Sequence, residues 1–597
     1  MQRRKLLQGA AALPLAALAP WKVLAAPARA LRRVRPADPA WPTPAQWQQL
    51  NSITGDNLFA VQPLFAACAT GAGSAACQEV LAGLRNPFYL GDQPAGTQVS
   101  GWLDAWTPAA SAYALRARHS RDITAAVNFA RIHHLRLVVK GGGHSYQGTS
   151  NAPDSLLVWT RALNQVQLHD AFVGAGCAGT LEPVPAVSTG AGAMWIDLYH
   201  AVTTEAGRYV QGGGCATVGV AGLIQSGGFG SFSKGFGSAC SSLLEAEVVT
   251  ADGTVRLANA CSNADLFWAL KGGGGGSWGV VTRLTLRTHP LPQFFGYAEG
   301  KIKARSDAAF RRLVARFVAF YASALFNPHW GEQAAIGQDN TLRLSLVSQG
   351  LTEEESGKLW QPFFDWVRAA PADYTVTDEL IVGVHPARGW WDAQNRRSMT
   401  LDSRAGAPAE HGWWKGDQEQ VGMYLHGYES LWLPASLLQA DAQARLADAL
   451  VAASRHKEVG LHFNKGLAGA PPAALSAAQE TAMNPAATTA FALAIIADGE
   501  APAYPGMPNA RVHTEAARKD AQSIDAATAQ LARVAPQGGS YLSESNYFNP
   551  HWQQAYFGEH YAKLAAVKAK YDPDGLFFVH HGVGCEHWSA DGFTRIA

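Results

Sequence analysis

The amino-acid sequence predicts an α+β protein with more than one domain. The chain has 597 residues, more than one hydrophobic core usually serves, so two or three domains are expected. Short strands and glycine-rich turns dominate residues 135–290, whereas amphipathic helices mix with strands after Pro290. The 60 glycines are clustered, which indicates places where backbone must come close to another group.

The overall composition excludes several kinds of partner. Charged residues make up 16% of the chain and the formal net charge is +1, so a basic face for a nucleic acid is not expected. After residue 30, no segment has the roughly 20 consecutive apolar residues that cross a membrane. We therefore expect neither a nucleic-acid partner nor a membrane span, and we predict no metal site.

Residues 1–30 have the order of a targeting segment. Arg3 and Arg4 precede an apolar, alanine-rich stretch that runs to about Ala19, and small residues follow at 26, 28 and 30. The arginine pair favours a twin-arginine signal peptide and export to the periplasm or the outside. The alternative is a frayed terminus of a cytoplasmic protein.

Elements can be assigned from residue 105 onward, after an N-terminal extension over residues 31–104 rich in Pro, Ala and Gly. Ile123, Val127 and Ala130 share one face of a helix, and Asp252-Gly253 is typical of a hairpin turn. The expected elements are a helix at 122–134, strands at 135–140, 156–159 and 280–288, and a hairpin of 244–250 with 253–257.

The region after Pro290 contains longer helices. Phe310, Val314, Phe317 and Tyr321 form one apolar stripe, which predicts a helix at 306–324. Further helices are expected at 352–369, 435–454, 515–534 and 553–570, and strands at 342–348, 458–464 and 489–497.

The first glycine cluster is Lys140–Tyr146, with the sequence KGGGHSY after a predicted strand. Three glycines let the backbone turn tightly and present N–H groups to an anion such as a pyrophosphate. A histidine that ends such a loop lies beside whatever the loop holds. The alternative is a tight turn with a surface histidine.

The second cluster, Gly212–Gly222, surrounds Cys215 and Thr217 and continues through Gly227–Gly230. So many glycines around one cysteine indicate backbone that lies flat against a large planar ligand. A flexible linker fits poorly, because apolar residues such as Val218 and Ile224 are regularly placed.

The third cluster, Lys271–Val281, contains Gly274, Gly276 and Gly279 at the spacing of the dinucleotide fingerprint. That fingerprint must follow a strand and open a helix. Here a helical stretch precedes the glycines and a strand follows them, so a Rossmann site is rejected.

Four segments together resemble the FAD-linked oxidases of the vanillyl-alcohol oxidase superfamily, most nearly the berberine-bridge-enzyme-like branch. They are VVKGGGHSYQGTS, GGGCATVGVAGLIQSGGFG, DLFWALKGGGGGSWGVVT and YFGEHYAKLAAVKAKYDPDGLFF. The resemblance covers roughly 105–290 and 536–597. It implies a two-part FAD-binding domain with mixed sheets (105–290), a substrate domain of antiparallel sheet flanked by helices (291–535), and a C-terminal segment (536–597) that returns to the FAD-binding domain.

By this resemblance, FAD is attached covalently through His144 and Cys215. An imidazole nitrogen adds to the flavin 8-methyl group, a thiolate adds to ring carbon 6, and the flavin carries the redox chemistry. The residues expected to line the cofactor are Gly141, Gly142, Gly143, Ser145, Gly148, Thr217, Val218, Gly219 and Gly222.

The expected reaction is hydride transfer from a CH–OH group while a base takes the hydroxyl proton. A saccharide or an aromatic or alkyl alcohol would be the small-molecule substrate. Tyr541 and Glu544 are the first candidates for catalysis, in a segment where Ser543 departs from the family's Tyr-x-Asn. The second group of candidates is His462, Asn464 and Lys465. Each of these could instead be an ordinary hydrogen-bonded polar residue.

Oxygen is the expected electron acceptor and hydrogen peroxide the product. In the family, valine at position 218 goes with oxygen access and a bulkier leucine with its exclusion. One alternative is a dehydrogenase that uses another acceptor. A second alternative is a flavin-holding or ligand-binding protein without turnover.

The sequence also leads to predictions for the cysteines and for a set of aromatic residues. The chain has seven cysteines, and if Cys215 holds flavin the other six allow up to three disulfides, with Cys68 and Cys77 close enough to bridge. The alternative is that most are small buried hydrophobes. We also expect some members of an aromatic set to be exposed and to stack on sugar rings or aromatic substrates, the others being core residues. The set comprises Trp330, Trp390, Trp391, Trp413, Trp414, Tyr424 and Trp432.

Overall fold

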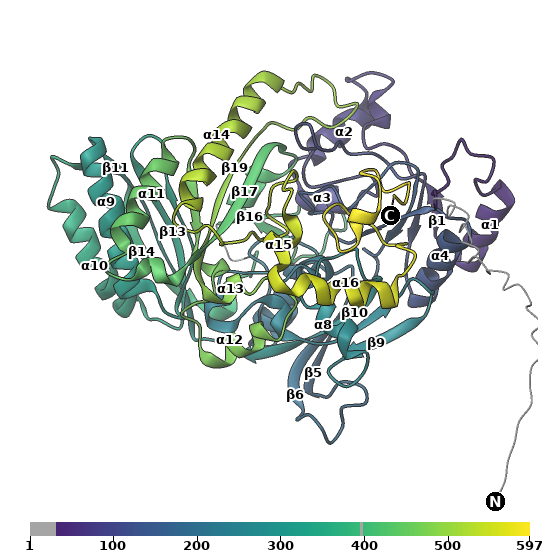
Figure 1. The fold of residues 1–597 in the computed structure, drawn as a ribbon, viewed down its shortest axis with the longest axis horizontal. Helices are drawn as coiled ribbons and strands as arrows, with labels where there is room; N and C mark the ends of the chain where they lie inside the picture. Colours follow the sequence, from purple (N-terminus) through teal and green to yellow (C-terminus); the bar gives the residue numbers. More distant parts are fainter. Residues whose placement is uncertain (1–30, 395–397, 597) are drawn as a thin grey trace, which may run out of the picture.

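The computed structural model describes residues 31–394 and 398–596. The predicted signal peptide therefore lies outside the described residues. A large sheet with long helices fills one half of the molecule, and two smaller sheets fill the other half (Figure 1). The predicted α+β class is confirmed. Among the described residues, no helix combines the length and the apolar character needed to cross a bilayer.

The first sheet has four strands and is mostly parallel. Its central strand is parallel to both neighbours, and an antiparallel strand closes one edge. Helix α4 (Ser120–Ile132) packs between this sheet and the second one, and the Asp122 carboxylate caps it by accepting the backbone N–H of His119 at 3.0 Å. The strands in spatial order are β1 (Leu58–Ala60), β2 (Tyr113–Arg116), β4 (Ser155–Trp159) and β3 (Arg136–Lys140).

The second sheet is antiparallel and is organised around one long strand. The predicted hairpin forms its edge, with Gly253 at a φ of +77° in the turn, a conformation that glycine adopts without strain. The strands in spatial order are β5 (Val166–Phe172), β6 (Val184–Gly190), β10 (Val280–Pro290), β8 (Leu243–Val249) and β9 (Val255–Asn259), and β7 (Arg208–Val210) also pairs with β10.

The third sheet has seven antiparallel strands, and long helices cover it (Figure 1). Its core is rich in leucine, alanine and phenylalanine from both layers. The strands in spatial order are β14 (Tyr374–Pro386), β11 (Phe294–Ala304), β13 (Thr341–Gln349), β12 (Trp330–Ile336), β18 (Val459–His462), β19 (Ala490–Glu500) and β17 (Tyr424–Pro434). The covering helices are α9 (Asp307–Phe320), α10 (Glu353–Arg368), α11 (Gln443–Ser454) and α14 (Thr514–Ala532).

Shorter elements complete the described chain. A two-stranded sheet is formed by β15 (Met399–Leu401) and β16 (Gly412–Trp414). The remaining helices are α1 (Pro44–Ile53), α2 (Ala75–Gly83), α3 (Pro87–Gly91), α5 (Trp195–Tyr199), α6 (Val220–Gln225), α7 (Ser233–Phe236), α8 (Ala264–Leu270), α12 (Pro472–Gln479), α13 (Ala486–Thr489), α15 (Trp552–Phe557) and α16 (Tyr561–Tyr571).

The C-terminal segment crosses back to the half that holds the two smaller sheets. Helix α16 packs on α8, and Phe577 forms a bridge with Leu137 of β3 (Figure 1). Lys568 of α16 is buried and donates hydrogen bonds to the carbonyls of Ser277 and Phe577, each at 2.7 Å. These bonds fix the segment beside the third glycine cluster.

Two predicted helices differ from those observed. Residues 435–438 form a 3-10 turn, and the α-helix predicted over 435–454 begins only at Gln443. The helix predicted over 553–570 is broken at Gly558, whose φ of +55° ends α15 before α16 begins. A glycine at positive φ cannot continue a right-handed helix.

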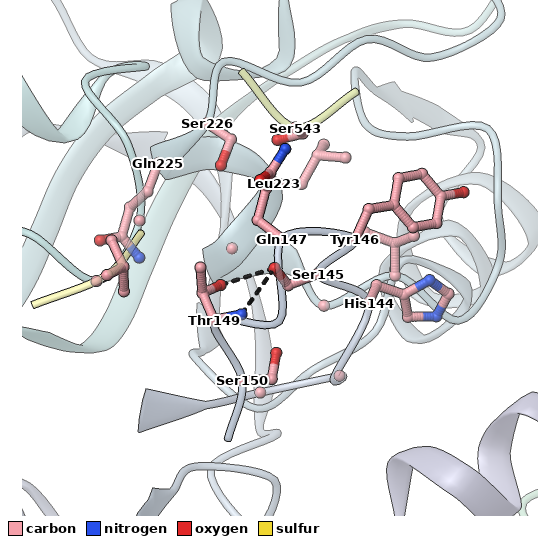
Figure 2. A pocket seen from close by; sticks show the side chains of 18 of the residues that line it. His144, Ser145, Tyr146, Gln147, Thr149, Ser150, Leu223, Gln225, Ser226 and Ser543 are labelled. Carbon is pink, nitrogen blue, oxygen red and sulfur yellow. Dashed lines mark hydrogen bonds between the residues drawn. The ribbon is translucent and has the colours of Figure 1, made fainter. Parts of the chain in front are cut away.

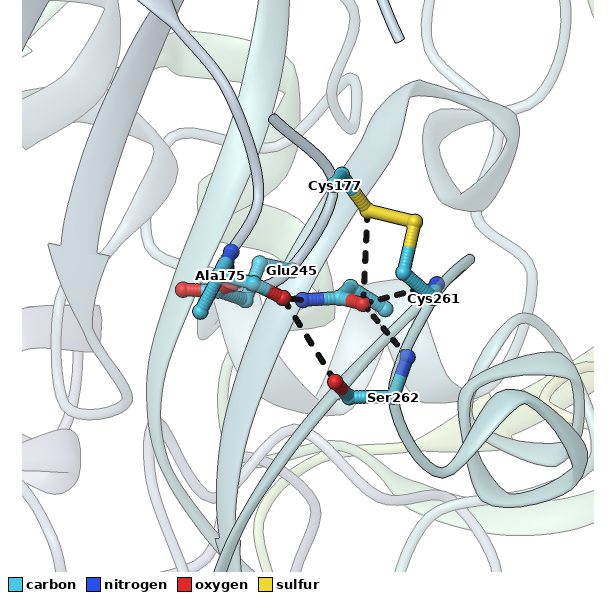
Figure 3. The surroundings of a disulfide bond; sticks show 6 residues. Ala175, Cys177, Glu245, Cys261 and Ser262 are labelled. Atoms are coloured by element: carbon cyan, nitrogen blue, oxygen red, sulfur yellow. Dashed lines mark hydrogen bonds between the residues drawn. A yellow bond between two sulfur atoms is a disulfide. The ribbon is translucent and has the colours of Figure 1, made fainter. Parts of the chain in front are cut away.

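Two disulfides form among the described residues. Cys68 pairs with Cys77, as predicted, and Cys177 pairs with Cys261 at the end of β9 (Figure 3). Cys215 is free, but so are Cys240 and Cys585, so only two of the three allowed disulfides are present.

Candidate active site

A cavity of about 320 Å³ lies where all three glycine clusters meet the C-terminal segment. The first cluster follows β3, the second precedes α6, and the third joins α8 to β10. The close-up in Figure 2 shows side chains of the first two clusters around this space, together with Ser543. Segments more than 300 residues apart in the sequence therefore build one site.

The first two glycine loops touch each other directly. A Cβ atom on Gly142 would lie 2.8 Å from the backbone nitrogen of Gly219, and one on Gly219 would lie 2.9 Å from that of Gly142. Neither position has room for a side chain. This contact brings His144 and Cys215 to the same cavity, which both residues line.

His144 is held through one ring nitrogen. Its Nε2 and the Thr217 hydroxyl are hydrogen-bonded at 2.9 Å, which links the two loops a second time. Burial lowers the pKa of His144 to about 4, so the imidazole is neutral near pH 7. When Nε2 carries the proton, Nδ1 keeps a free lone pair and is the nitrogen that can form a bond.

Cys215 faces a carboxyl group. Its Sγ lies 3.4 Å from Oδ1 of Asp417, a residue in a 3-10 turn (Lys415–Gln420) between β16 and β17. Burial, and then the Asp417 charge, raise the pKa of the Cys215 thiol well above its usual range. The sulfur is therefore a thiol until a base takes its proton.

Two features of the cavity fit a large planar cofactor with polar edges. A Cβ atom on Gly222 would meet nothing within 4 Å, so a ring can approach the backbone there. The amide oxygens of Gln147 and Gln225 are buried at the cavity and have no hydrogen-bond partner among the described residues. Such groups normally bind a partner, and a flavin offers both donors and acceptors.

Most of the predicted cofactor residues line the cavity, but Gly148 does not. The lining residues among them are Gly141, Gly142, Gly143, His144, Ser145, Cys215, Thr217, Val218, Gly219 and Gly222. A Cβ atom on Gly148 would lie 2.5 Å from the Trp106 ring, so packing against Trp106 accounts for that glycine. Ser145 accepts hydrogen bonds from the backbone N–H and hydroxyl of Thr149 and so shapes the first loop (Figure 2).

Three of the five catalytic candidates line the cavity. Lys465 donates to both carboxylate oxygens of Glu544, at 2.6 and 2.5 Å, and this ion pair is largely buried. The Tyr541 hydroxyl accepts a hydrogen bond from the backbone N–H of Gly228 at 3.2 Å. Burial, and then the Glu544 charge, raise the pKa of Tyr541, so its phenol stays protonated at neutral pH.

The other two candidates lie outside the cavity lining. Asn464 is buried and donates to the Gly230 carbonyl at 3.2 Å, which fixes the second glycine cluster. His462 pairs within the sheet through β18, and burial holds its pKa well below the usual range. Their sequence neighbour Lys465 reaches the cavity because the chain leaves the strand through a 3-10 turn after His462.

Further polar residues at the site were not predicted from the sequence. Glu332 lies within β12 at a φ of +60°, and its Oε1 accepts a 2.5 Å hydrogen bond from Ser231 beside the Cys215 loop. Asp417, Tyr146 and the glycines at 274–276 line the cavity. No local sequence pattern points to Glu332 or Asp417. The third glycine cluster is a recognisable motif, but none of its residues was predicted to line the cofactor.

The exposure expected for the aromatic set is wrong for most of its members. Both residues of the 390–391 pair, together with Trp330, Trp413 and Trp432, are at most 5% exposed, and the set does not contribute to the cavity lining. They are core residues: Trp391 stacks on Tyr199 with ring centroids 4.0 Å apart. Trp414 and Tyr424 are partly buried.

The sequence matches two family models, described as FAD binding domain over residues 111–259 and as berberine and berberine like over residues 536–584. Among solved structures, the glucooligosaccharide oxidase of Acremonium strictum, described with a 6-S-cysteinyl, 8α-N1-histidyl FAD, has a TM-score of 0.60 at 21% identity. That match covers 80% of this chain and 92% of that one, and it shows a shared fold.

Two further matches extend over nearly the whole chain. The FAD-linked oxidoreductase easE of Trichophyton verrucosum is 30% identical over 592 residues, which are 94% of this chain and 91% of the relative. The solved structure of the VAO-type flavoprotein MtVAO615 from Myceliophthora thermophila has a TM-score of 0.76 at 25% identity and covers 94% of this chain and 98% of that chain. The chain therefore belongs to the VAO-type FAD-linked oxidoreductases, in their berberine-bridge-enzyme-like branch.

Proposed function

We propose that this protein is an FAD-dependent oxidase with a flavin attached through both His144 and Cys215. It takes hydride from a CH–OH group of a saccharide or of an aromatic or alkyl alcohol, and oxygen becomes hydrogen peroxide. One observation carries the proposal: a single cavity brings both anchor side chains together with the Lys465–Glu544 ion pair.

The state of each anchor supports the double attachment. His144 is neutral and keeps one ring nitrogen free, as a nucleophile requires. Cys215 stands on the loop that touches the His144 loop, so the two side chains can reach different positions of one ring. The Acremonium strictum enzyme carries its FAD on the same two residue types.

The polar side chains supply the proton chemistry, and FAD, when bound, accepts the hydride. Glu544 is the base that takes the hydroxyl proton of the substrate, because its carboxyl group lines the cavity and Lys465 holds it in place through a hydrogen bond of 2.6 Å. The protonated Tyr541 phenol is a donor that can orient the substrate oxygen. Both residues belong to the C-terminal segment, which thus completes the site.

Oxygen as acceptor is supported by Val218, which lines the cavity, because in the family a valine at this position goes with oxygen access and a bulkier leucine with its exclusion. The dehydrogenase alternative would require that oxygen be kept from the flavin. The binding-protein alternative would require that the Lys465–Glu544 pair have no part in proton transfer.

A substrate screen tests this proposal. Purified protein would be mixed with saccharides and with aromatic and alkyl alcohols, and peroxide would be measured by a coupled peroxidase. The proposal expects bleaching of the flavin by a substrate without air, then rapid recovery and peroxide once air is admitted. Recovery over many minutes with fast turnover on an artificial acceptor would establish the dehydrogenase. Absence of bleaching by every compound of these classes would contradict the proposed chemistry.

A further inference from the structure

The Asp417 carboxyl group is placed to serve the Cys215 sulfur. The two residues are 202 positions apart in the sequence, yet Sγ and Oδ1 are 3.4 Å apart inside the cavity. The backbone amide of Ala216, next to Cys215, lowers the pKa of the same carboxyl group, so Asp417 faces the cysteine loop. Its other oxygen, Oδ2, is buried and has no hydrogen-bond partner among the described residues.

The short turn that carries Asp417 is tied to both anchor loops. Tyr146, two residues after His144, donates through its hydroxyl to the Gln420 side chain at 3.2 Å. Asp417 contacts the Cys215 loop at the other end of the turn. The turn therefore holds a carboxyl group in fixed geometry between the two proposed attachment points.

The charges around this pair allow proton exchange between thiol and carboxyl group. Burial, and then the Glu332 charge, raise the pKa of Asp417 to about 7, so both of its protonation states are populated near neutral pH. Lys465 favours the thiolate form of Cys215, whereas Glu332 disfavours it. Tyr146, Tyr199 and Tyr428 also lie near the sulfur and stay protonated because burial raises their pKa values.

We propose that Asp417 accepts the proton of the Cys215 thiol when the sulfur bonds to the flavin. This inference rests on the double attachment proposed above. The thiol proton passes to the Asp417 carboxylate, a sulfur lone pair forms the bond to ring carbon 6, and the hydrogen on that carbon leaves as a proton. Two electrons remain on the ring system, and dioxygen takes them with two protons as hydrogen peroxide. The aspartate is then free to release its proton to solvent.

The test measures attachment rather than turnover. Wild type, Asp417→Asn and the control Glu419→Gln, an exposed carboxylate of the same turn, would be purified and denatured, and their flavin peptides analysed by mass spectrometry. Wild type and E419Q should carry flavin on both residues. D417N should carry flavin on His144 with the sulfur bond at least about tenfold under-represented, since a positioned base typically contributes 10²–10⁴-fold.

A pH series separates a proton acceptor from a structural support. Raising the pH in air should increase the sulfur bond in purified D417N step by step, because each pH unit raises the thiolate fraction about tenfold even while burial keeps most of the thiol protonated. Asp417→Glu should restore the bond at neutral pH. An equal amount of sulfur bond in D417N and wild type at pH 7 would overturn the inference while leaving the double attachment intact.

Two other outcomes are also decisive. Loss of both bonds in D417N, without rescue by high pH or by D417E, would make Asp417 a structural residue and overturn the inference. A wild type that lacks the sulfur bond would instead overturn the double attachment itself. Circular dichroism and thermal midpoints of all variants would show which of them fold.

Discussion

The surroundings of the two proposed attachment residues have different effects on their nucleophilicity. Burial keeps the His144 imidazole neutral and therefore nucleophilic without help. The same burial keeps the Cys215 thiol protonated and therefore a poor nucleophile without a base. We expect from this contrast that the histidine bond forms first and that the sulfur bond is the slower, more sensitive step.

The two anchors lead to a prediction about denatured protein. Wild type precipitated with acid should stay yellow, and His144→Ala and Cys215→Ala should each retain flavin because the other bond remains. The double variant should release it. Cys240→Ala is the matched control, because Cys240 is free but lies outside the cavity lining. Free FAD from wild type would mean that neither residue is an anchor, and release from H144A alone would mean a single link.

Glu544 leads to a second prediction at this scale. Glu544→Gln should lower turnover by about 10²–10⁴-fold, because an amide cannot take the substrate proton. The flavin should remain attached, because the ion-pair partner of Glu544 is Lys465 and neither anchor residue is changed. Glu559→Gln, an exposed change in the same C-terminal segment, serves as control. Single-turnover flavin bleaching measures the step directly, and an E544Q rate near that of wild type would move the role of base to another residue.

Site residues could be predicted where the backbone itself is specialised. The loops of His144 and Cys215 are marked by runs of glycine, which only a close backbone approach requires. Asp417 and Glu332 are ordinary acids in unremarkable sequence, and only the folding of distant segments brings Asp417 to the cavity and Glu332 beside the Cys215 loop. Gly148 was predicted to line the cofactor, but the close neighbour of this glycine is the Trp106 ring.

At the scale of helices and strands, the predictions that rest on strong local sequence patterns were correct. The apolar stripe of 306–324 forms α9 and a following turn, and Asp252-Gly253 forms the hairpin of β8 and β9. Strand β14 was not predicted; it is an edge strand of the third sheet, and most of its residues are partly or fully exposed. Helix α16 begins late because Gly558 needs a positive φ, which depends on tertiary packing more than on the helical pattern.

The disulfide at the end of β9 leads to an element-scale prediction. Cys177–Cys261 closes a loop of 84 residues, whereas Cys68–Cys77 closes one of 9. The chain-entropy estimate is about 4–5 kcal/mol for the first and about 2–3 kcal/mol for the second. Cys177→Ser/Cys261→Ser should therefore lower the denaturation midpoint more than Cys68→Ser/Cys77→Ser.

The residues around Cys177–Cys261 allow a more specific test. Asn259 accepts the backbone N–H groups of Cys261 and Ser262 and donates to Glu245, so the loop keeps local order without the bond (Figure 3). Flavin should stay attached in both double variants, since neither pair lines the cavity. A larger loss of stability for the 68–77 pair would contradict the entropic argument.

At the scale of the whole molecule, the site exists only when the entire chain has folded. Its lining comes from the loop after β3, the loop before α6, the turn at 415–420 and the C-terminal segment near Tyr541. A cofactor bound among these parts should stabilise their assembly, because a ligand that binds only the folded state shifts the equilibrium toward it. Flavin loading and complete folding are therefore expected to occur in the same compartment.

This coupling bears on how the protein would leave the cytoplasm. We propose export through the arginine pair at positions 3 and 4, on a route that carries chains already folded around their cofactor. Arg3→Lys/Arg4→Lys keeps the charge but removes the pair, so the protein should accumulate in the cytoplasm with its flavin attached. Lys22→Arg, in the same segment, should be exported like wild type. Fractionation of cells with detection of protein and of attached flavin measures both quantities.

Unchanged appearance of the lysine variant outside the cytoplasm would contradict the proposed route. Export of wild type with loading of flavin only afterwards would contradict the coupling of folding, flavin loading and transport.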